Sequence, residues 1–396
     1  MPQIGFPARA AVLARLRQAL DAGTLGQAHL FHGPEGSGKE VTALELARLA
    51  NCARSPACTA APLCESCAKA VSFQHPDIRW IGPAPASLGE AETVELLAAK
   101  RDDCFYQPPF AASSDVTIGA VDDPAPLTVR ALLRFLRLQP FQGRFKVAIV
   151  MNAHRFTAEA ANAFLKTLEE PPPNALILLL TSNRAAMLPT LVSRCQAVRF
   201  EPYPEEELAS LLAARGESPT RVAALARAAD GSVRKALALC APDVAAVYVW
   251  AGEILERIHA GAVSSAHLAA EMLHKGIVPE GEDDDGVSLP APPVAADLAE
   301  RRERALQLCE MLNLYYGDLL ACRARGADWR PRRPAKAARL RDLAGRRSTR
   351  GLLDDITRLE RAKGDIDRNL NLGLTMAALL QGLVSNAEQD RAAAGP

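Results

Sequence analysis

The first 200 residues alternate between short apolar runs and longer amphipathic stretches. Five runs are predicted to be strands, at 29–33, 75–82, 145–151, 175–183 and 196–200. Those at 145–151 and 175–183 show no polar alternation, which is typical of parallel strands covered on both faces. Apolar residues at helical spacing occupy most of the remainder, at 7–23, 39–52, 89–101, within 123–140 after a proline-rich approach, and at 157–173. Thr157 is the expected cap of the last helix. Strands and helices that alternate over this length predict a doubly wound α/β domain.

The pattern changes after residue 202. Residues 204–241 contain three short helical segments, and from 244 onward the chain is helical apart from an acidic, proline-rich stretch at 279–293. Residues 83–120 are irregular for most of their length and are interpreted as an insertion in the α/β domain. We therefore expect three domains: an α/β core at 1–202, a three-helix segment at 203–243 and a helical domain at 244–396.

The chain has 396 residues, of which 49% are hydrophobic, so it is long enough to bury a substantial core. Its formal net charge is zero, which argues against an autonomous DNA-binding protein but not against a subunit of an assembly on DNA. The first ten residues lack the basic region and apolar run of a signal peptide. No run of about 20 apolar residues is present to span a bilayer. We expect a cytoplasmic protein with no membrane contact.

The sequence GPEGSGKE follows the first predicted strand and leads into the next helix. It has G-x-x-x-x-G-K spacing from Gly33 to Gly38 and Lys39, with a further glycine at Gly36. In such a strand–loop–helix unit, backbone N–H groups converge on phosphate oxygens, and the helix N-terminus and the lysine add positive charge. A plain glycine turn with a solvated Lys39 is the alternative. The setting favours a nucleotide-binding phosphate loop.

The partners that this loop needs for catalysis are missing from the sequence. In phosphate-loop sites, Mg²⁺ is held by a Ser or Thr after the lysine and by an acid at the end of a neighbouring strand. Glu40 stands in place of the hydroxyl, and Met151 and Asn152 stand where carboxylates belong. We expect no ATP hydrolysis at this site, and ATP binding that is weak or absent.

Four of the nine cysteines lie between residues 52 and 67. They are Cys52, Cys58, Cys64 and Cys67, with the spacing C-x₅-C-x₅-C-x₂-C. The close pair Cys64 and Cys67 suits tetrahedral Zn²⁺, and four thiolates leave no open position, so the predicted zinc site is structural. The alternative is a set of unrelated buried thiols. The remaining five are interpreted as small hydrophobic residues: Cys104, Cys195, Cys240, Cys309 and Cys322.

A basic stretch at 322–350 contains ten Arg and one Lys against two Asp. These charges could form a solvated face or pair with the acidic stretch at 279–293. They could instead contact DNA phosphates or an acidic partner. Trp329 is the only aromatic residue there, so stacking on bases is not expected.

Several stretches occur in an order that identifies a family. They are QAHLFHGPEGSGKE, the four cysteines, HPDI, AANAFLKTLEEPPP, LPTLVSRCQAVRF, DGSVRKALAL and RNLNLGLTMAALLQGL. With them the chain resembles the bacterial clamp-loader family, the AAA+ subunits of the DNA polymerase III holoenzyme. The resemblance implies an AAA+ core, a lid at 203–243, an oligomerising collar at 244–396 and a zinc module at the cysteines. It also implies partners: the gamma/tau and delta subunits and, through the complex, the sliding clamp and primed DNA.

The resemblance assigns roles to three further residues. Arg194, in the SRC triplet, would be an arginine finger that reaches the ATP of a neighbouring subunit. Thr181 and Arg234 occupy the positions of the two sensors of the family and would be vestigial here. From the residues alone, Arg194 is a surface or ion-paired arginine.

Within this family, the absence of acids at Met151 and Asn152 resembles the delta-prime subunits rather than the gamma/tau motor subunits. We expect a structural subunit that helps to load the clamp without hydrolysing ATP, and that has enzymatic activity only as part of the polymerase complex. An active motor subunit is the first alternative. A P-loop kinase or another nucleotide-handling enzyme is the second, although the sequence offers it no candidate base.

Overall fold

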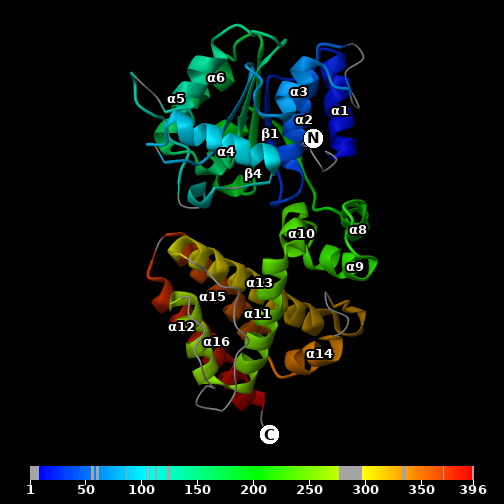
Figure 1. Cartoon of the computed structure of the whole chain (residues 1–396), viewed down its shortest axis with the longest axis vertical. Coiled ribbons are helices and arrows are strands. Elements are labelled where there is room, and N and C mark those ends of the chain that lie inside the picture. The colour runs from blue at the N-terminus through cyan, green and yellow to red at the C-terminus, as the bar shows by residue number, and fades with distance from the viewer. Residues whose placement is uncertain are drawn as a thin grey trace. The chain divides into compact units, whose positions relative to one another are not determined.

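The described residues of the computed structural model form two compact units (Figure 1). One unit extends to Pro204 and includes Gly231–Arg234, and the other contains Glu205–Asp230 and Lys235–Pro396. The structure describes residues 9–54, 58, 62–85, 87–103, 105–106, 108–111, 114–122, 125–275, 297–331, 336–368 and 370–394. The acidic stretch at 279–293 and Cys104 lie outside these residues.

The first unit is built on a five-stranded parallel sheet in the order β2-β3-β4-β1-β5. The strands are β1 (Ala28–His32), β2 (Ile78–Ile81), β3 (Lys146–Val150), β4 (Ala175–Thr181) and β5 (Gln196–Arg199). Every residue of β3 and β4 is buried, as their unbroken apolar sequences predict. The five predicted strands and their doubly wound α/β arrangement are thereby confirmed.

Helices cover both faces of this sheet. They are α1 (Ala10–Asp21), α2 (Lys39–Ala50), α3 (Glu65–Val71), α4 (Glu90–Asp102), α5 (Val129–Leu136), α6 (Ala158–Glu169) and α7 (Pro189–Val192). Alternate residues of the strands enter different apolar clusters: Leu176 and Leu178 join the cluster with α1 and α2, whereas Ile177 and Leu179 join the cluster with α5 and α6. The twofold repeat of the strand thus divides the core into two layers.

Two helix predictions can be compared directly with the structure. Thr157 caps α6 by accepting a hydrogen bond from the N–H of Ala160 at 3.2 Å, as expected. The amphipathic helix expected within 123–140, after the proline-rich approach, is α5, which begins at Val129 and ends at Leu136. The extended backbone of Thr128 (φ −100°, ψ 157°) starts it, and Pro140 favours an extended conformation in the residue before it.

The turn that leads into β3 is fixed by two buried polar side chains, Asp77 and Asn51. The carboxylate of Asp77 accepts the N–H groups of residues 141, 142 and 143, each at 2.7 Å, and the ammonium of Lys146 at 2.8 Å. Burial raises the pKa of Asp77, but these four donors outweigh it and hold the pKa well below its usual range. The amide of Asn51 binds the N–H and the carbonyl of Phe145 at 2.8 and 3.0 Å.

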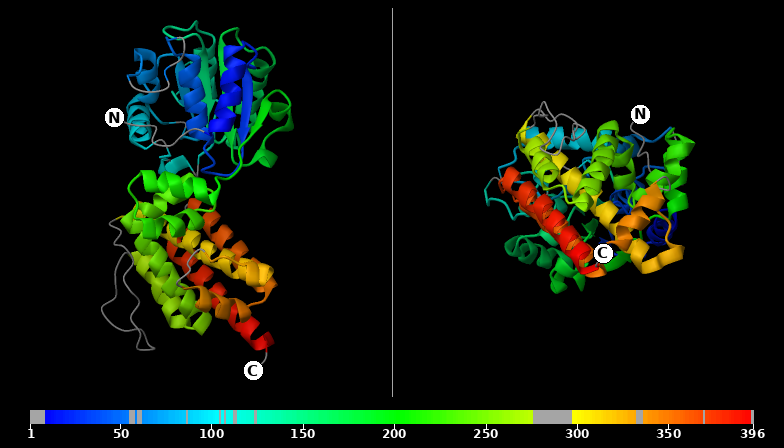
Figure 2. Two further views of the ribbon diagram at one scale, coloured as in Figure 1. Left: turned by 90° about the vertical axis from the view of Figure 1, so that its right-hand side faces the viewer. Right: turned by 90° about the horizontal axis from the view of Figure 1, so that it is seen from below.

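The second unit is helical throughout its described residues, as predicted. Its helices are α8 (Glu205–Ala214), α9 (Pro219–Ala228), most of α10 (Val233–Cys240), α11 (Pro242–Ala260), α12 (Val263–Lys275), α13 (Leu298–Arg325), α14 (Ala337–Gly345), α15 (Thr349–Asp367) and α16 (Leu372–Ala394). The long helices pack side by side, α13 against α11 and α15, and α16 against α12 and α15 (Figure 2). None of the described helices is long and apolar enough to cross a membrane. The division into a lid and a collar stays a prediction.

A buried arginine joins the helices of this unit. Arg347, whose side chain is fully buried, donates to Asp355 at 2.6 Å, to Asp390 at 2.7 Å and to Nε2 of His259 at 3.2 Å. Nδ1 of His259 donates to the carbonyl of Leu255 at 2.8 Å, so Nε2 carries the lone pair that accepts from Arg347. Arg347 therefore connects α11, α15 and α16, and this member of the basic stretch has a structural role.

Other arginines of the basic stretch also have partners within the unit. Arg339 pairs with Glu256 and Asp342, and Arg346 pairs with Asp342. Arg341 lies over the ring of Trp329, with 5.5 Å to its centroid. Internal pairing therefore accounts for several of these charges without nucleic acid.

The neutral state of His259 predicts a pH dependence. Burial, with a smaller contribution from the charge of Arg347, lowers the pKa of His259 to about 4. The unfolded chain binds this proton below pH 6.5 and the folded one does not, so stability falls as the pH falls from 6.5 towards 4. Between pH 6.5 and pH 5 this amounts to about 1.5 kcal/mol of unfolding free energy.

Urea unfolding in a Trp80→Phe background measures this loss, because the two remaining tryptophans, Trp250 and Trp329, both lie in the helical unit. His259→Gln should be less stable at pH 7 but should lose much less stability between pH 6.5 and pH 5. An equal loss in both proteins would mean that His259 is not the titrating group.

Candidate functional site

The phosphate loop lies between β1 and α2 and has the backbone conformation that its glycines permit. Gly36 and Gly38 have φ of 70° and 88°, and Gly33 has φ of 154°. A Cβ at Gly33 would lie 2.1 Å from the carbonyl oxygen of Phe200, and one at Gly36 would lie 2.0 Å from Oγ of Ser232. Side chains are therefore excluded from these positions by both conformation and space.

Lys39 is folded back onto its own loop. Its ammonium donates to the carbonyl oxygens of Gly33 and Pro34, each at 2.6 Å, and to Oγ of Ser37 at 3.3 Å. The residue is 7% exposed, and this burial lowers its pKa to about 8. Its hydrogen-bonding capacity is thus met without a phosphate.

The space in front of the loop is small. The cavity there has a volume of about 20 Å³, room for about one water molecule. Its walls include Phe105, Met151, Leu180 and the helix start at Lys39 and Glu40. A nucleotide polyphosphate does not fit into this cavity as it stands.

The position of the metal-binding hydroxyl is occupied by an acid and its counter-ion. Oε2 of Glu40 lies 3.9 Å from the ammonium of Lys100, which comes from α4, and it has no hydrogen-bond donor among the described residues. Burial raises the pKa of Glu40, although the positive charge of Lys100 opposes the change. Met151, 6% exposed, offers no oxygen ligand from its side chain. These residues do not fit Mg²⁺, because each of the two carboxylates in the described wall of the cavity, Glu40 and Glu35, already lies beside a cation.

The two sensor-like residues lie differently in relation to this cavity. Arg234 lines it and pairs with Glu35 of the loop at 3.2 Å. Thr181, at the end of β4, is not part of the lining. Its hydroxyl is hydrogen-bonded to Nδ1 of His154 at 3.0 Å and accepts the N–H of Asn183 at 3.0 Å.

Arg194 follows α7 and is held by an ion pair that the sequence did not reveal. Its guanidinium donates to Glu169, at the end of α6, at 2.9 and 2.6 Å, and to the carbonyl of Thr190 at 3.0 Å. Its side chain remains 34% exposed. Arg194 does not line the cavity of its own chain. The guanidinium is therefore oriented but accessible from outside.

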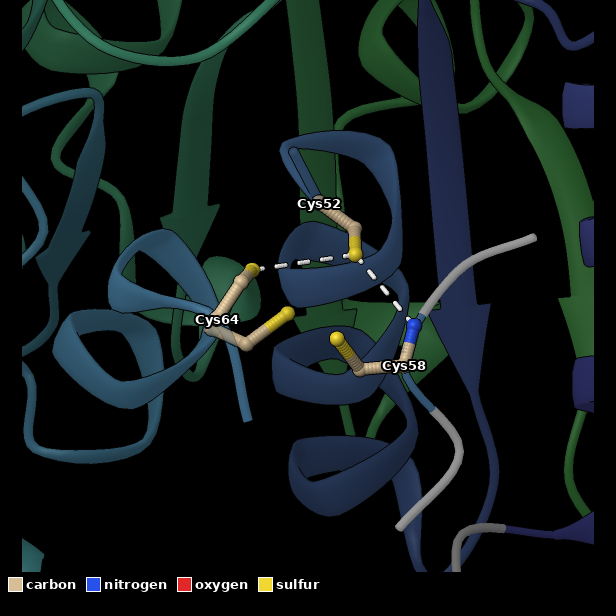
Figure 3. A group of neighbouring side chains, drawn as sticks. Cys52, Cys58 and Cys64 are labelled. Carbon is tan, nitrogen blue, oxygen red and sulfur yellow. Dashed lines mark hydrogen bonds between the residues drawn. The ribbon is translucent and has the colours of Figure 1, made fainter. Parts of the chain in front are cut away.

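The four cysteines predicted as ligands come together. All four sulfur atoms lie within 4.8 Å of one another, from the end of α2, the following loop and the start of α3 (Figure 3). The sulfur atoms of Cys52 and Cys64 are 3.9 Å apart. Zn–S bonds of about 2.3 Å in a tetrahedron separate sulfurs by about 3.8 Å, so the spacing suits a four-coordinate ion. This cluster can bind a metal ion.

The thiols of the cluster are shifted in opposite directions: the pKa values of Cys52 and Cys64 are lowered, whereas burial and hydrogen bonds with Cys64 and Cys52 raise the pKa of Cys67. Burial opposes ionisation of Cys64, but hydrogen bonds from the backbone N–H groups of Cys67 and Ala53 outweigh it and lower its pKa to about 6. The backbone N–H of Cys58 donates to the sulfur of Cys52 at 3.3 Å. Outside the cluster, burial raises the pKa of Cys195 and Cys240 to about 11, as expected for inert small side chains.

Arg48 supports the cluster, and sequence reasoning missed it. It is 4% exposed, and its guanidinium donates to the sulfur of Cys67 at 3.1 Å and to the carbonyl of Cys58 at 2.9 Å. The guanidinium is also paired with the carboxylate of Glu45 at 2.8 and 2.5 Å, so Arg48 contacts the cluster as a hydrogen-bond donor whose charge is already balanced. The signal in the sequence was an arginine one helical turn before Cys52, on a helix most of whose residues are buried.

Comparisons with known proteins match the first half of the chain. The family model described as DNA polymerase III, delta subunit, matches residues 8–204. The gamma/tau subunit of Mycobacterium tuberculosis is 35% identical over 202 residues, 51% of this chain and 29% of that protein. The delta' subunit of Bacillus subtilis is 26% identical over 208 residues, 52% of each chain. A solved gamma subunit-related protein from Thermotoga maritima aligns with 96% of this chain and 99% of its own, at 19% identity and a TM-score of 0.38.

The fold and the loop define a P-loop-like α/β protein, and the matches are more specific. The chain belongs to the bacterial clamp-loader family of DNA polymerase III subunits. It spans from under a third to about half of the length of these two curated relatives.

The closed loop generates a prediction about nucleotides. The isolated chain should bind ATP with a Kd above about 1 mM, with or without Mg²⁺, because Lys39 is already satisfied and the cavity is too small. Isothermal titration of the wild type and of Lys39→Ala should give the same result. Tighter binding that disappears in Lys39→Ala would show that the loop opens and functions.

Proposed function

We propose that this chain is a delta-prime-like subunit of the clamp loader, which helps to place the sliding clamp on primed DNA without hydrolysing ATP itself. Its partners would be the gamma/tau and delta subunits, in the cytoplasm. The observation that carries the proposal is the pair of Glu40 and Lys100 in place of a magnesium site. A subunit with this pair can belong to an ATP-driven assembly only as a structural or trans-acting member.

A gamma/tau-like motor subunit is the competing proposal, and one observation favours it. The identity to the mycobacterial gamma/tau protein, 35%, exceeds that to the Bacillus delta' protein, 26%. Overall identity reflects the whole domain, whereas hydrolysis depends on a few oxygen ligands. Glu40, Met151 and Asn152 therefore count for more than the percentages, and they oppose a motor. A kinase-like enzyme has no support, since the described lining of the cavity is closed and lacks an acceptor site.

Arg194 is proposed to act as an arginine finger on the ATP of a neighbouring subunit. In phosphoryl transfer, a guanidinium stabilises charge that develops on the γ-phosphate oxygens. The ion pair with Glu169 would orient Arg194, and its partial exposure leaves it accessible. Glu169 lies in the family stretch LKTLEEPP and Arg194 in the family triplet SRC. The two stretches would then act together, one holding the guanidinium that the other supplies.

The cysteine cluster is proposed to hold one structural zinc ion. Four sulfur ligands leave no position for a substrate, and zinc prefers such a set in tetrahedral geometry. When bound, the ion would cross-link α2, the following loop and α3, and it would take no part in a reaction. Arg48 would hold Cys67 through its hydrogen bond to the sulfur.

Metal analysis of protein purified without chelator tests this assignment, with about one zinc per chain expected. Cys64→Ser should lose the metal and expose residues 52–67 to protease, while the parallel sheet stays folded, because structural zinc contributes local folding free energy. Cys195→Ser, a free cysteine outside the cluster, is the matched control and should keep its zinc. Arg48→Gln should weaken zinc affinity by about 10–100-fold. A wild-type protein without metal would exclude the site.

Reconstitution with the other loader subunits tests Arg194. Arg194→Ala should fold and assemble, yet slow ATP turnover and clamp loading, because one such arginine contributes about 10³–10⁵ in rate in well-studied enzymes. The overall decrease should be partial if other interfaces of the assembly keep their own arginines. Arg194→Lys should restore little of the lost turnover, since an ammonium lacks the planar set of N–H donors with which a guanidinium binds two oxygens at once.

Arg199→Ala is the matched control, because Arg199 is an exposed arginine on β5 that pairs with Glu201. It should leave turnover unchanged. Normal assembly and a wild-type rate of clamp loading in Arg194→Ala would show that Arg194 is an ordinary surface residue and would exclude its role as an arginine finger.

A further inference from the structure

A second and larger cavity lies beside β2, the strand at one end of the described sheet. Its volume is about 260 Å³, against about 20 Å³ in front of the phosphate loop. Residues of α2, α3, β2, α4 and α5 line it, and α4 belongs to the insertion at 83–120. Neither the phosphate loop nor the cysteines form part of its wall.

Most of this wall is apolar. The side chains come from both layers of the domain, and the main ones are Leu44, Phe73, Trp80, Leu97, Leu127 and Phe135. Protein interiors are packed as densely as organic crystals, with few voids larger than a water molecule. A space of this size between packed helices and a strand is therefore suited to a bound molecule.

The polar groups of the wall that lack full partners are donors. Arg79, on β2, pairs with no carboxylate in the described part of the chain. Its guanidinium lies over the ring of Phe135, 5.0 Å from the centroid, and makes one long hydrogen bond, 3.4 Å, to the carbonyl of Ala131. Trp80 is 8% exposed, and its indole N–H is buried with no acceptor among the described residues.

His75, in the same wall, shows the contrast. Its Nδ1 accepts the N–H of Asp77 at 3.0 Å, which leaves Nε2 to donate to the hydroxyl of Ser66 at 3.0 Å. Both ring nitrogens are therefore occupied, and His75 offers nothing to a ligand. The need for a partner is confined to Arg79 and Trp80.

Burial removes water from the half-buried guanidinium of Arg79 and from the indole N–H of Trp80. This costs free energy, because no anion and no acceptor among the described residues replaces the lost hydration. Burial also lowers the pKa of Arg79, as expected for a cation with no counter-ion. An anionic acceptor at this position would remove the cost, and an apolar group attached to it would fill the remaining space. A carboxylate suits the planar, two-pronged geometry of the guanidinium.

We propose that this cavity binds a small amphipathic carboxylate, with its head group at Arg79 and its apolar body between Trp80, Leu97 and Leu44. The volume lies just below the 300–1,000 Å³ typical of drug-sized ligands, so the ligand is a short-chain or single-ring acid. The proposal concerns a site separate from the phosphate loop and does not depend on the proposed role in clamp loading.

Octanoate and octanol form a matched pair of probes, because they share the chain and differ in the charge of the head group. Titration calorimetry on the full chain should show that octanoate binds at least about tenfold more tightly than octanol. Arg79→Met keeps an apolar stem of similar length and should bring the two affinities together by weakening octanoate alone. Arg101→Met, on α4 but outside the cavity wall, is the control and should preserve the difference.

Leu97→Trp should fill the cavity and abolish binding of both probes, with circular dichroism to confirm that the protein remains folded. Equal affinity of the two probes for the wild type would overturn the role of Arg79. Binding of neither probe at millimolar concentration, or unchanged binding in Leu97→Trp, would overturn the site itself. A failure of the clamp-loading experiments would leave all of these outcomes as they are.

Discussion

The buried carboxylate of Asp77 is the constraint on which the first unit depends. It accepts three successive backbone N–H groups of the turn at 141–143 and the ammonium of Lys146, so it fixes where β3 begins beside β2. Removal of one partner from a buried ion pair costs about 3–5 kcal/mol, because the other charge stays behind without compensation. The side chains of β3, which enter both apolar layers, are placed by this one anchor.

The same anchor is connected to the cysteine cluster. The amide of Asn51 binds the backbone of residues 144 and 145, while its own carbonyl accepts the hydroxyl of Ser66 at 2.5 Å. Ser66 is hydrogen-bonded to His75, which in turn accepts the N–H of Asp77. Asn51 and Ser66 directly adjoin Cys52 and Cys67 of the cluster. A metal in the cluster would therefore stabilise the corner of α2, α3 and β2, at the opposite end of α2 from the phosphate loop.

The insertion helix α4 gives the domain two features that an ordinary phosphate-loop protein lacks. From its last turn, Lys100 lies 3.9 Å from the carboxylate of Glu40 and pairs with it. From its first two turns, Thr93 and Leu97 form part of the wall of the larger cavity beside β2. One segment thus contributes both to the surroundings of the phosphate loop and to the wall of the larger cavity beside β2.

The sequence by itself determined what local patterns encode. The unbroken apolar runs of β3 and β4 specified buried parallel strands, Thr157 specified a helix start, the glycines at 33, 36 and 38 specified the loop, and the cysteine spacing specified a cluster. Tertiary structure alone decided that Lys100 meets Glu40, Arg48 meets Cys67, Glu169 holds Arg194, and Arg79 borders a cavity without an acid. These contacts join residues on different elements, and their energies depend on burial and charge that exist only after the sheet order has brought those elements together.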